Sequence, residues 1–442
     1  MSHRLPKLLL GILLFLVLAL LLAPGLIGRG VRDNTIERAL TLFPAEARQQ
    51  LSISERSYSG GWFASSGVLD VLYNPLGLNE RIALTVRYTI DHGPVVRTDA
   101  GLRPGLAYAR LTPEVDDVEF NSALAELPFP PPQIDLSLLA GFDRSLRLGL
   151  TVTPVDYAGA DGEFLFGGID AAMVAHGDQS ADFSFTMGRL QARAAGGIGF
   201  SVDGIRLQSQ SAQLDDLLAP ASADVAITGI ASDGPVPVRI DSITAASRLT
   251  PNPSGPDRLD IQQQFDVNGM ESALPVAALS LTTAVNGLEG EIIRNYYTLL
   301  SEFQQQVSGG GTVSGLSLND LGQDLALELV GNPLQLNNAA TGTVYEGAHS
   351  VRLDIDWAGL PGLTSLRNLA IARIVAALGL ELDVDLDLEA VLRSPLAAYV
   401  DPYVQQGVIV LDNNRIRLQA RLRDSELLLN GEAIALDQYI VL

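Results

Sequence analysis

The histidines of this sequence are its first candidates for chemistry. Beyond the N-terminal residues there are three, His92, His176 and His349, and none has a second histidine at metal-ligand spacing. The sequence has no His-Glu-x-x-His zinc motif and no Gly-x-Ser-x-Gly nucleophile elbow. We therefore predict no metal site, no cofactor and no catalytic residue.

The carboxylates are the second candidates, because four of them alternate with apolar residues at Glu381, Asp383, Asp385 and Asp387. On an extended strand these four side chains share one face. Clustered carboxylates can bind Ca²⁺. Regular alternation, however, is typical of a solvated sheet face opposite a buried apolar face. We favour this second interpretation.

The densest unusual segment is Tyr58-Ser-Gly-Gly-Trp-Phe-Ala-Ser-Ser66. Its Trp62 and Phe63 either line a ligand groove or follow a turn and anchor the first strand on the core, and we favour the turn. A glycine-rich stretch at 309–315 resembles a phosphate-binding loop only superficially, because it follows a predicted helix rather than a strand. We interpret that stretch as a linker.

Composition excludes several classes of chemistry. The chain has no cysteine, so disulfides, thiol nucleophiles and cysteine-ligated metals are excluded. Its single lysine, Lys7, lies at the N-terminus, which excludes phosphate-loop nucleotide chemistry and lysine Schiff bases within the fold. There are 51 acidic against 29 basic residues, for a net charge of −22, which opposes non-specific binding to nucleic acid or to an anionic membrane surface.

The first thirty residues differ from the rest. An apolar run from Leu8 to Ile27 follows Arg4 and Lys7, and as a helix it would be about 30 Å long, the thickness of a bilayer core. A cleaved signal peptide is the alternative, but its apolar stretch is normally shorter. We predict a single transmembrane anchor, with a cytoplasmic N-terminus and the bulk of the chain outside the cytoplasm.

The remainder is predicted to form mainly β-strands with a few helices. This is a β-rich α+β fold class. Apolar and polar residues alternate with period two, which predicts a large antiparallel, curved sheet or a sandwich. The alternating stretches are 82–90, 146–152, 183–185, 200–207, 236–240, 325–329, 351–357, 380–388 and 416–422. We predict helices at 31–50, 289–307, 364–378 and 389–406, the last interrupted by prolines. The expected parts are 1–30 (tail and anchor), 31–290 and 291–442.

A short pattern of Val-x-Gly followed by an apolar residue recurs along the chain. Examples are Val202–Ile205, Val267–Met270, Val285–Leu288 and Val313–Leu316. We interpret each as strand, turn, strand, with glycine providing an unusual backbone angle.

These features carry a family resemblance. An N-terminal anchor followed by a helix and Tyr-x-x-Gly-Trp-Phe-x-Ser resembles the bacterial YdgA-like family, also called DUF945, and the ending at Leu427-Leu-Leu-Asn-Gly-Glu432 is similar to that of the family. The residues carrying the likeness, expected to be structural, are Tyr58, Gly61, Trp62, Phe63, Ser65, Asn430 and Gly431. The resemblance implies a single-pass protein of the bacterial inner membrane, with a large β-rich region in the periplasm and no established enzymatic activity. The repeated strands also resemble, in style, the AsmA-like envelope proteins, which implies a lipid-holding groove.

Three functions remain open from the sequence. The first is a non-enzymatic cell-envelope protein that handles phospholipid through an apolar groove of the sheet. The second is a scaffold or assembly protein that binds envelope proteins or itself, as a homo-oligomer, through exposed strand edges. The third, the least favoured, is a hydrolase that uses carboxylates.

Overall fold

The computed structural model describes residues 51–73, 82–115, 128–160, 162–234, 236–255, 257–272, 275–308, 315–363, 365 and 370–435. The predicted anchor at 8–27 and the predicted helix at 31–50 lie outside these residues. No helix within the described ranges is both long and apolar enough to cross a bilayer.

The described chain is mainly β. Strands far outnumber helices, and the strands form one large antiparallel sheet, so the predicted β-rich class is confirmed. The chain divides into two compact units. Unit 1 contains the described residues up to Val155, with Gly167–Met187 and Gln210–Leu217, and unit 2 contains Asp156–Phe166, Gly188–Ser209 and the described residues from Leu218 onward.

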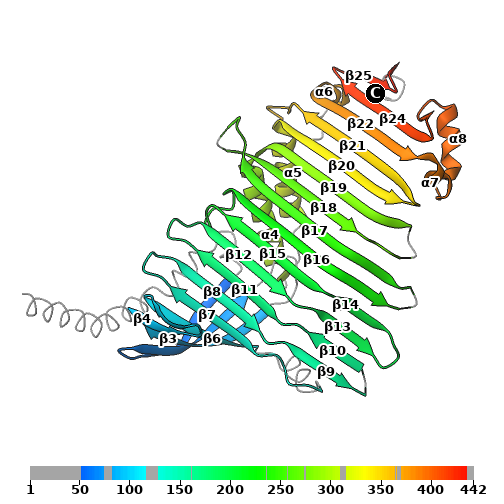
Figure 1. Ribbon diagram of the computed structural model, residues 1–442. Helices are drawn as coiled ribbons and strands as arrows, with labels where there is room; N and C mark the ends of the chain where they lie inside the picture. Colours follow the sequence, from blue (N-terminus) through cyan, green and yellow to red (C-terminus); the bar gives the residue numbers. More distant parts are fainter. Residues whose placement is uncertain are drawn as a thin grey trace, which may run out of the picture. The chain divides into compact units, whose positions relative to one another are not determined.

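Unit 1 is built largely from strands that pair with their neighbours along the chain (Figure 1). Its ladder runs β1, β2, β3, β6, β7, β8, β11, β12. The bounds are β1 (Leu51–Gly60), β2 (Ala64–Tyr73), β3 (Ile82–His92), β6 (Ala107–Val115), β7 (Ile134–Ala140), β8 (Leu146–Val152), β11 (Ile169–Ala175) and β12 (Ala181–Met187). A separate hairpin, β4 (Val95–Thr98) and β5 (Gly101–Pro104), lies between β3 and β6 in the chain.

Unit 2 has a longer ladder of the same kind. The order is β10, β13, β14, β16, β17, β18, β19, β20, β21, β22, β24, β25, β26. The earlier strands are β9 (Val155–Gly159), β10 (Gly162–Phe166), β13 (Leu190–Ala194), β14 (Gly199–Val202), β15 (Gly204–Ser211), β16 (Ala221–Asp233), β17 (Val238–Pro251) and β18 (Arg258–Asn268). The later ones are β19 (Val276–Glu289), β20 (Leu334–Val344), β21 (Gly347–Trp357), β22 (Leu378–Asp387), β23 (Val410–Asp412), β24 (Arg415–Arg423), β25 (Glu426–Leu429) and β26 (Glu432–Ile434).

All described helices belong to unit 2. They are α4 (Gly290–Ser308), α5 (Gly315–Gly331), α6 (Ile371–Ala377), α7 (Leu388–Leu392) and α8 (Ala397–Gln405). The predicted helix at 289–307 is confirmed as α4. The predicted helix at 389–406 is present as two helices, because the chain turns at Ser394 and Pro395 before α8 begins. Within the predicted helix at 364–378, the described helical residues are those of α6.

Two predictions are corrected by α5. The stretch 325–329 was expected to be a strand, but it lies inside this helix, as does the glycine of Val313–Leu316. Leu321, Leu325 and Leu329 recur every four residues, which is a helical period, and the alternation of Leu325, Leu327 and Leu329 is part of that longer pattern. A five-residue window could not separate the two periods.

The recurring Val-x-Gly pattern has more than one structure. Val202–Ile205 and Val267–Met270 lie where strands end, as predicted. Val285–Leu288 instead lies inside β19, where Gly287 has φ of 76° and the strand continues past it. Gly269 and Gly287 both have a left-handed angle, whereas Gly204 does not, so the pattern marks neither one backbone angle nor one chain reversal.

Candidate functional site

The candidate site is an apolar row that crosses the sheet of unit 2. Directly paired residues on antiparallel strands point to the same face, and the pairing from β16 to β24 aligns one apolar residue on each of eight strands. This apolar row consists of Val225, Ala245, Phe265, Leu281, Ala340, Val351, Val384 and Leu418.

The middle of the apolar row is open to solvent. Phe265, Leu281 and Val351 keep between 37% and 41% of their surface exposed, as does Leu279, two residues along β19 on the same face. We call these four residues the open patch. A contiguous group of large, exposed apolar side chains on one face is typical of a binding surface. Exposed apolar residues scattered singly over a surface are common and have no such meaning.

The same face is closed at its β24 end. Ile416 is only 3% exposed and packs with Val391 of α7 and Val400 of α8, and the partly buried Leu386 and Val404 complete this closed patch. Helix α7 begins at Asp387, whose side chain accepts a 2.9 Å hydrogen bond from the backbone N–H of Ala390. The two helices therefore cover this end as a helical layer covers a sheet.

Helices α4 and α5 lie behind the strands in Figure 1. Trp357, which shares the face of the apolar row, donates from its indole Nε1 to the carbonyl of Val330 in α5 at 2.9 Å. Asn295 of α4 donates to the Glu328 carboxylate of α5 at 2.9 and 3.0 Å. The helical pair is thus joined to the apolar face near Trp357, while the open patch stays exposed.

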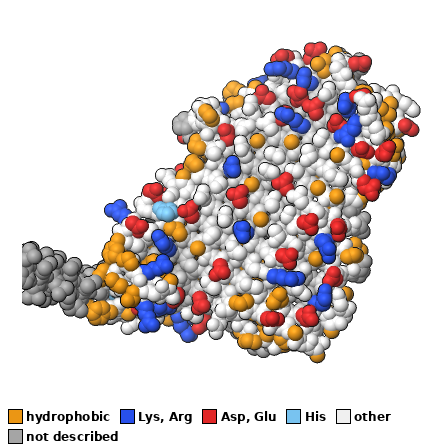
Figure 2. Space-filling view, in the orientation of Figure 1, with side chains coloured by type: hydrophobic (Ala, Val, Ile, Leu, Met, Phe, Trp, Pro, Cys, Tyr) orange, Lys and Arg blue, Asp and Glu red, His pale blue; other side chains and the backbone are white. Residues whose placement is uncertain are grey.

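The opposite face of the sheet is polar. Figure 2 shows acidic and basic side chains spread over this side of unit 2. Glu381, Asp385 and Asp387 share this face, as predicted, and they pair with arginines of β24: Arg421 with Glu381, and Arg415 with both aspartates. The Glu381 carboxylate raises the pKa of Arg421. Within the described part of the chain, no group of three or more acids or histidines is placed to hold a metal ion.

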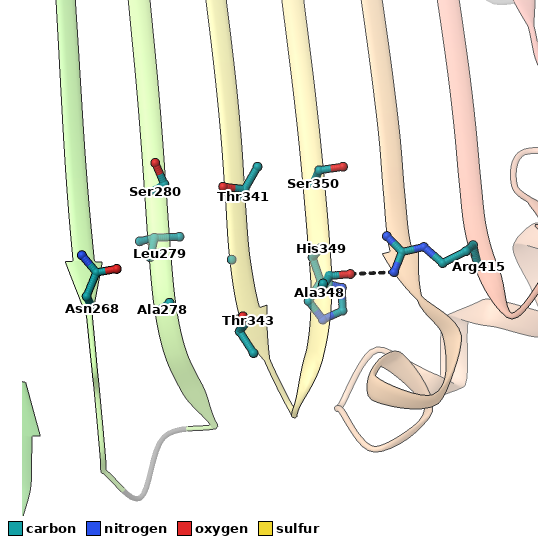
Figure 3. A pocket seen from close by; sticks show the side chains of 11 residues that line it. Asn268, Ala278, Leu279, Ser280, Thr341, Thr343, Ala348, His349, Ser350 and Arg415 are labelled. Atoms are coloured by element: carbon teal, nitrogen blue, oxygen red, sulfur yellow. Dashed lines mark hydrogen bonds between the residues drawn. The ribbon is translucent and has the colours of Figure 1, made fainter.

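A concavity of about 470 Å³ lies on this polar face (Figure 3). Its floor is formed by small and hydroxyl-bearing residues of β19, β20 and β21, including Ser280, Thr341 and Ser350. The Arg415 guanidinium closes one side by donating to the Ala348 carbonyl at 2.8 Å. The imidazole Nε2 of His349 lies 2.9 Å from the Val344 carbonyl. Among the described residues that line this concavity, no nucleophile is hydrogen-bonded to a base.

The predicted motif Tyr58–Ser65 forms the turn between β1 and β2. Gly61 donates its N–H to the carbonyl of Ala64 at 2.8 Å, which closes the turn. Trp62 and Phe63 are 47% and 57% exposed, so they do not anchor the strand on the core as expected. Tyr58 has that role, because it packs against the cluster that contains Tyr88 and Ile90.

The most buried polar pair of the motif is Ser65 with His92, each 4% exposed. The Ser65 Oγ lies 3.0 Å from His92 Nε2, and the Trp62 carbonyl lies 3.3 Å from His92 Nδ1. Because a carbonyl only accepts, Nδ1 is the donor in the contact with Trp62, and Nε2 is hydrogen-bonded to the Ser65 hydroxyl. The geometry resembles a nucleophile with its base, but burial keeps substrate from the hydroxyl. The pair connects β2 to the end of β3, a connection that sequence spacing did not indicate.

The second predicted motif, Asn430 and Gly431, lies in the last hairpin of the described chain. Asn430 and Gly431 form the turn between β25 and β26 with φ of 50° and 87°. The Asn430 amide also donates to the carbonyls of Gly407 and Val408, each at 3.0 Å, and its oxygen accepts from the N–H of Gln419 at 2.9 Å. This side chain therefore joins the segment after α8 to β24 and to the final hairpin.

The fold and these surfaces define a mainly β protein with one large antiparallel sheet and an apolar face that is partly open. The chain belongs to the family described as bacterial protein of unknown function (DUF945), whose profile matches residues 6–437, nearly the whole sequence, and the predicted resemblance is confirmed. No curated protein and no solved structure matches the chain.

Proposed function

We propose that this protein is a non-enzymatic component of the bacterial cell envelope that binds phospholipid acyl chains on the open patch of unit 2. The observation that carries the proposal is the exposure of Phe265, Leu281 and Val351 in one row of paired residues. Exposed apolar surface of this kind is stabilised when an apolar ligand removes it from water.

The size of the open patch suits an acyl chain. Strands lie about 4.8 Å apart, so the four strands β18 to β21 span about 14 Å. Half of a bilayer core is about 15 Å thick, which is the depth occupied by the acyl chains of one leaflet. Burial of an acyl chain contributes about 0.8 kcal/mol per CH₂ group, so partial burial across four strands is enough for reversible binding.

The proposed location rests on the sequence of the N-terminus. The apolar run from Leu8 to Ile27 is long enough for a single-pass anchor, and the short tail before this first helix favours a cytoplasmic N-terminus and a periplasmic body. The test uses a reporter that is active only outside the cytoplasm. We expect this reporter to be active when it is fused after residue 35. Reporter activity in the cytoplasm would contradict this topology, and a mature N-terminus beyond Pro24 would show that the segment is removed.

Retention of lipid by the full chain tests the proposed binding. The protein is purified in detergent, and bound phospholipid is counted by native mass spectrometry. The variant Leu281→Glu places a charge in the open patch, and we expect it to reduce bound lipid about tenfold, since a buried carboxylate opposes apolar contact. The matched control is Thr282→Glu, the next residue of β19, which points to the polar face and should retain lipid.

Comparison of these two variants separates the patch from the anchor, which carries lipid of its own in both. Equal lipid content in Leu281→Glu and Thr282→Glu would show that the open patch does not bind lipid. Urea denaturation of both variants confirms that the fold persists, as expected for a side chain already 41% exposed.

A second candidate, a scaffold that binds envelope proteins, is favoured by one surface of unit 2. Tyr399 and Tyr403 of α8 stack with ring centroids 6.3 Å apart, and both are exposed beside the exposed Leu396. Aromatic residues of this kind are enriched in protein interfaces. In-cell crosslinking from position 399 that recovers a partner or a second copy supports this candidate, and recovery of monomer alone contradicts it.

A further inference from the structure

Three turns lie side by side at one end of the unit 1 sheet. The N–H of His92 donates to the Phe63 carbonyl at 2.8 Å, which joins the β1–β2 turn to the end of β3. The N–H of Gly93 donates to Leu106 at 2.7 Å, and Leu106 donates to Ala140 at 2.8 Å. The β1–β2 turn, the base of the β4–β5 hairpin and the end of β7 therefore form one continuous edge.

Large apolar side chains are exposed along this edge. We call the set the turn patch; besides Trp62 and Phe63 it includes Leu102, which is 76% exposed. Its members are Trp62, Phe63, Val95, Leu102 and Phe142. In Figure 2, hydrophobic and basic side chains gather over the region that carries the β3 and β4 labels in Figure 1.

The β4–β5 hairpin is held so that its apolar residues face outward. Val96 on its inner face is 1% exposed, whereas Val95 and Leu102 lie on the outer face. Tyr108 donates to the Asp99 carboxylate at 2.5 Å, and Arg110 donates to it at 3.2 Å. The Tyr108 hydrogen bond is the main cause of the lowered pKa of Asp99. The hairpin is thus fixed by its inner face, and Val95 and Leu102 of its outer face are exposed.

Arginines surround the turn patch. Arg97, on the outer face with Leu102, and Arg144 are exposed, as is Arg103 on the inner face of the hairpin, and none of the three pairs with a carboxylate among the described residues. The chain as a whole has a net charge of −22, and these three arginines place positive charge on this edge, which also carries the exposed Asp99 and Asp143. Aromatic and apolar residues flanked by basic residues match the interface of an anionic bilayer, where rings lie at headgroup depth and arginines meet phosphates.

We propose that the turn patch docks on an anionic phospholipid surface and orients the body of the protein at the membrane. The proposal rests on the anchor proposed above. The 23 residues between Ile27 and Leu51 span about 35 Å even as a helix, which exceeds the rise of about 30 Å along β1 from Leu51 to the turn. The turn patch therefore lies within reach of the bilayer that holds the anchor.

The two tryptophans allow a direct test with the full chain. The protein is reconstituted in nanodiscs of phosphatidylcholine and phosphatidylglycerol, with Trp357→Phe leaving Trp62 as the sole emitter. We expect Trp62 emission to shift to shorter wavelength and to be quenched about twofold by brominated phospholipid. The variant Trp62→Phe, which reports Trp357 alone, serves as reference, and the difference between wild type and this variant gives the Trp62 signal independently.

Substitutions then test the chemistry of docking. The triple variant Arg97→Gln, Arg103→Gln, Arg144→Gln should lower quenching severalfold in phosphatidylglycerol discs and much less in pure phosphatidylcholine, because each arginine near an anionic surface contributes a roughly fivefold increase in binding. Leu102→Ser should also lower quenching. Its matched control is Ile198→Ser, an exposed residue of the β13–β14 turn in unit 2, which should leave quenching unchanged.

The outcomes separate this proposal from the one on which it rests. A chain that does not remain with the nanodisc contradicts the anchor, and the docking proposal with it. A chain that remains with the disc but shows unquenched Trp62 overturns docking and leaves the anchor intact. A Trp62 shift that appears in detergent only as protein concentration rises would identify the turn patch as a contact between copies and would also overturn it.

Discussion

The open patch and the closed patch lie on the same face of the same sheet, yet they differ in what covers them. Ile416 and Leu281 both occupy apolar positions of strands that alternate regularly, but Ile416 is 3% exposed and Leu281 is 41% exposed. The difference comes from α7 and α8, which pack over Ile416 and do not extend to β19. A strand with an apolar face therefore has either a structural or a binding role, and the covering layer decides which.

The largest expected effect tests this difference directly. Ile416→Ala removes a side chain packed between Val391 and Val400, and we expect it to lower the free energy of unfolding by about 3 kcal/mol, since a cavity remains. Leu281→Ala should cost about 1 kcal/mol, because much of that side chain is already in water. Urea denaturation of the two variants measures both values.

Equal losses for Ile416→Ala and Leu281→Ala would mean that the open patch is covered in the folded protein. Addition of phospholipid sharpens the comparison, because ligand that binds only the folded state raises its stability. We expect lipid to stabilise wild type and Ile416→Ala, and to stabilise Leu281→Ala less.

A smaller effect is expected where a polar side chain secures the closed end. Asn430→Ala removes the three hydrogen bonds to Gly407, Val408 and Gln419 and leaves alanine at φ of 50°, so we expect a loss of about 2 kcal/mol. Asn413→Ala is the matched control, since Asn413 has φ of 48° in the β23–β24 turn. It should cost about 1 kcal/mol. A loss in Asn430→Ala no larger than in the control would show that the hydrogen bonds do not stabilise the end.

The smallest expected effect concerns the β4–β5 hairpin, where a hydrogen bond to a carboxylate adds to the packing of Val96. The pKa of Asp99 is lowered in the folded state by the hydrogen bond from Tyr108, so its contribution to stability is present above the ordinary aspartate pKa and is lost as pH falls through the lowered value. Because the side chain is largely exposed, we expect less than about 1 kcal/mol. Asp99→Asn should flatten the acid limb of the stability profile slightly, and an unchanged profile would contradict this role.

The sequence predicted the strands more accurately than it predicted which strands are covered by helices. Alternation at 82–90 and 146–152 identified β3 and β8 correctly, because each has one apolar face over its full length. The acidic face of β22 was also predicted, but its arginine partners on β24 were not, since strand register is set by pairing across the sheet rather than along the chain.

The sequence predicted the kind of candidate site but not the residues that form it. A groove on an apolar sheet face was expected, yet nothing in the alternation of Phe265, Leu281 or Val351 distinguishes them from the residues that α7 and α8 cover. The Ser65–His92 contact was missed for a related reason, because 27 residues separate the two side chains and only the fold brings them to 3.0 Å. Trp62 was identified as unusual, but its exposure depends on a turn whose direction the sequence does not specify.

The insertion of α4 and α5 between β19 and β20 has a consequence for how the sheet forms. These two strands pair directly, although the 44 residues Gly290–Pro333 separate them, whereas the seven residues Gly269–Pro275 join β18 to β19. Closing the longer connection costs about 1.6 kcal/mol more in chain entropy. We therefore expect the strands up to β19 and the strands from β20 onward to form their antiparallel pairs separately. The pairing of β19 with β20 should then be a late, slow step of folding.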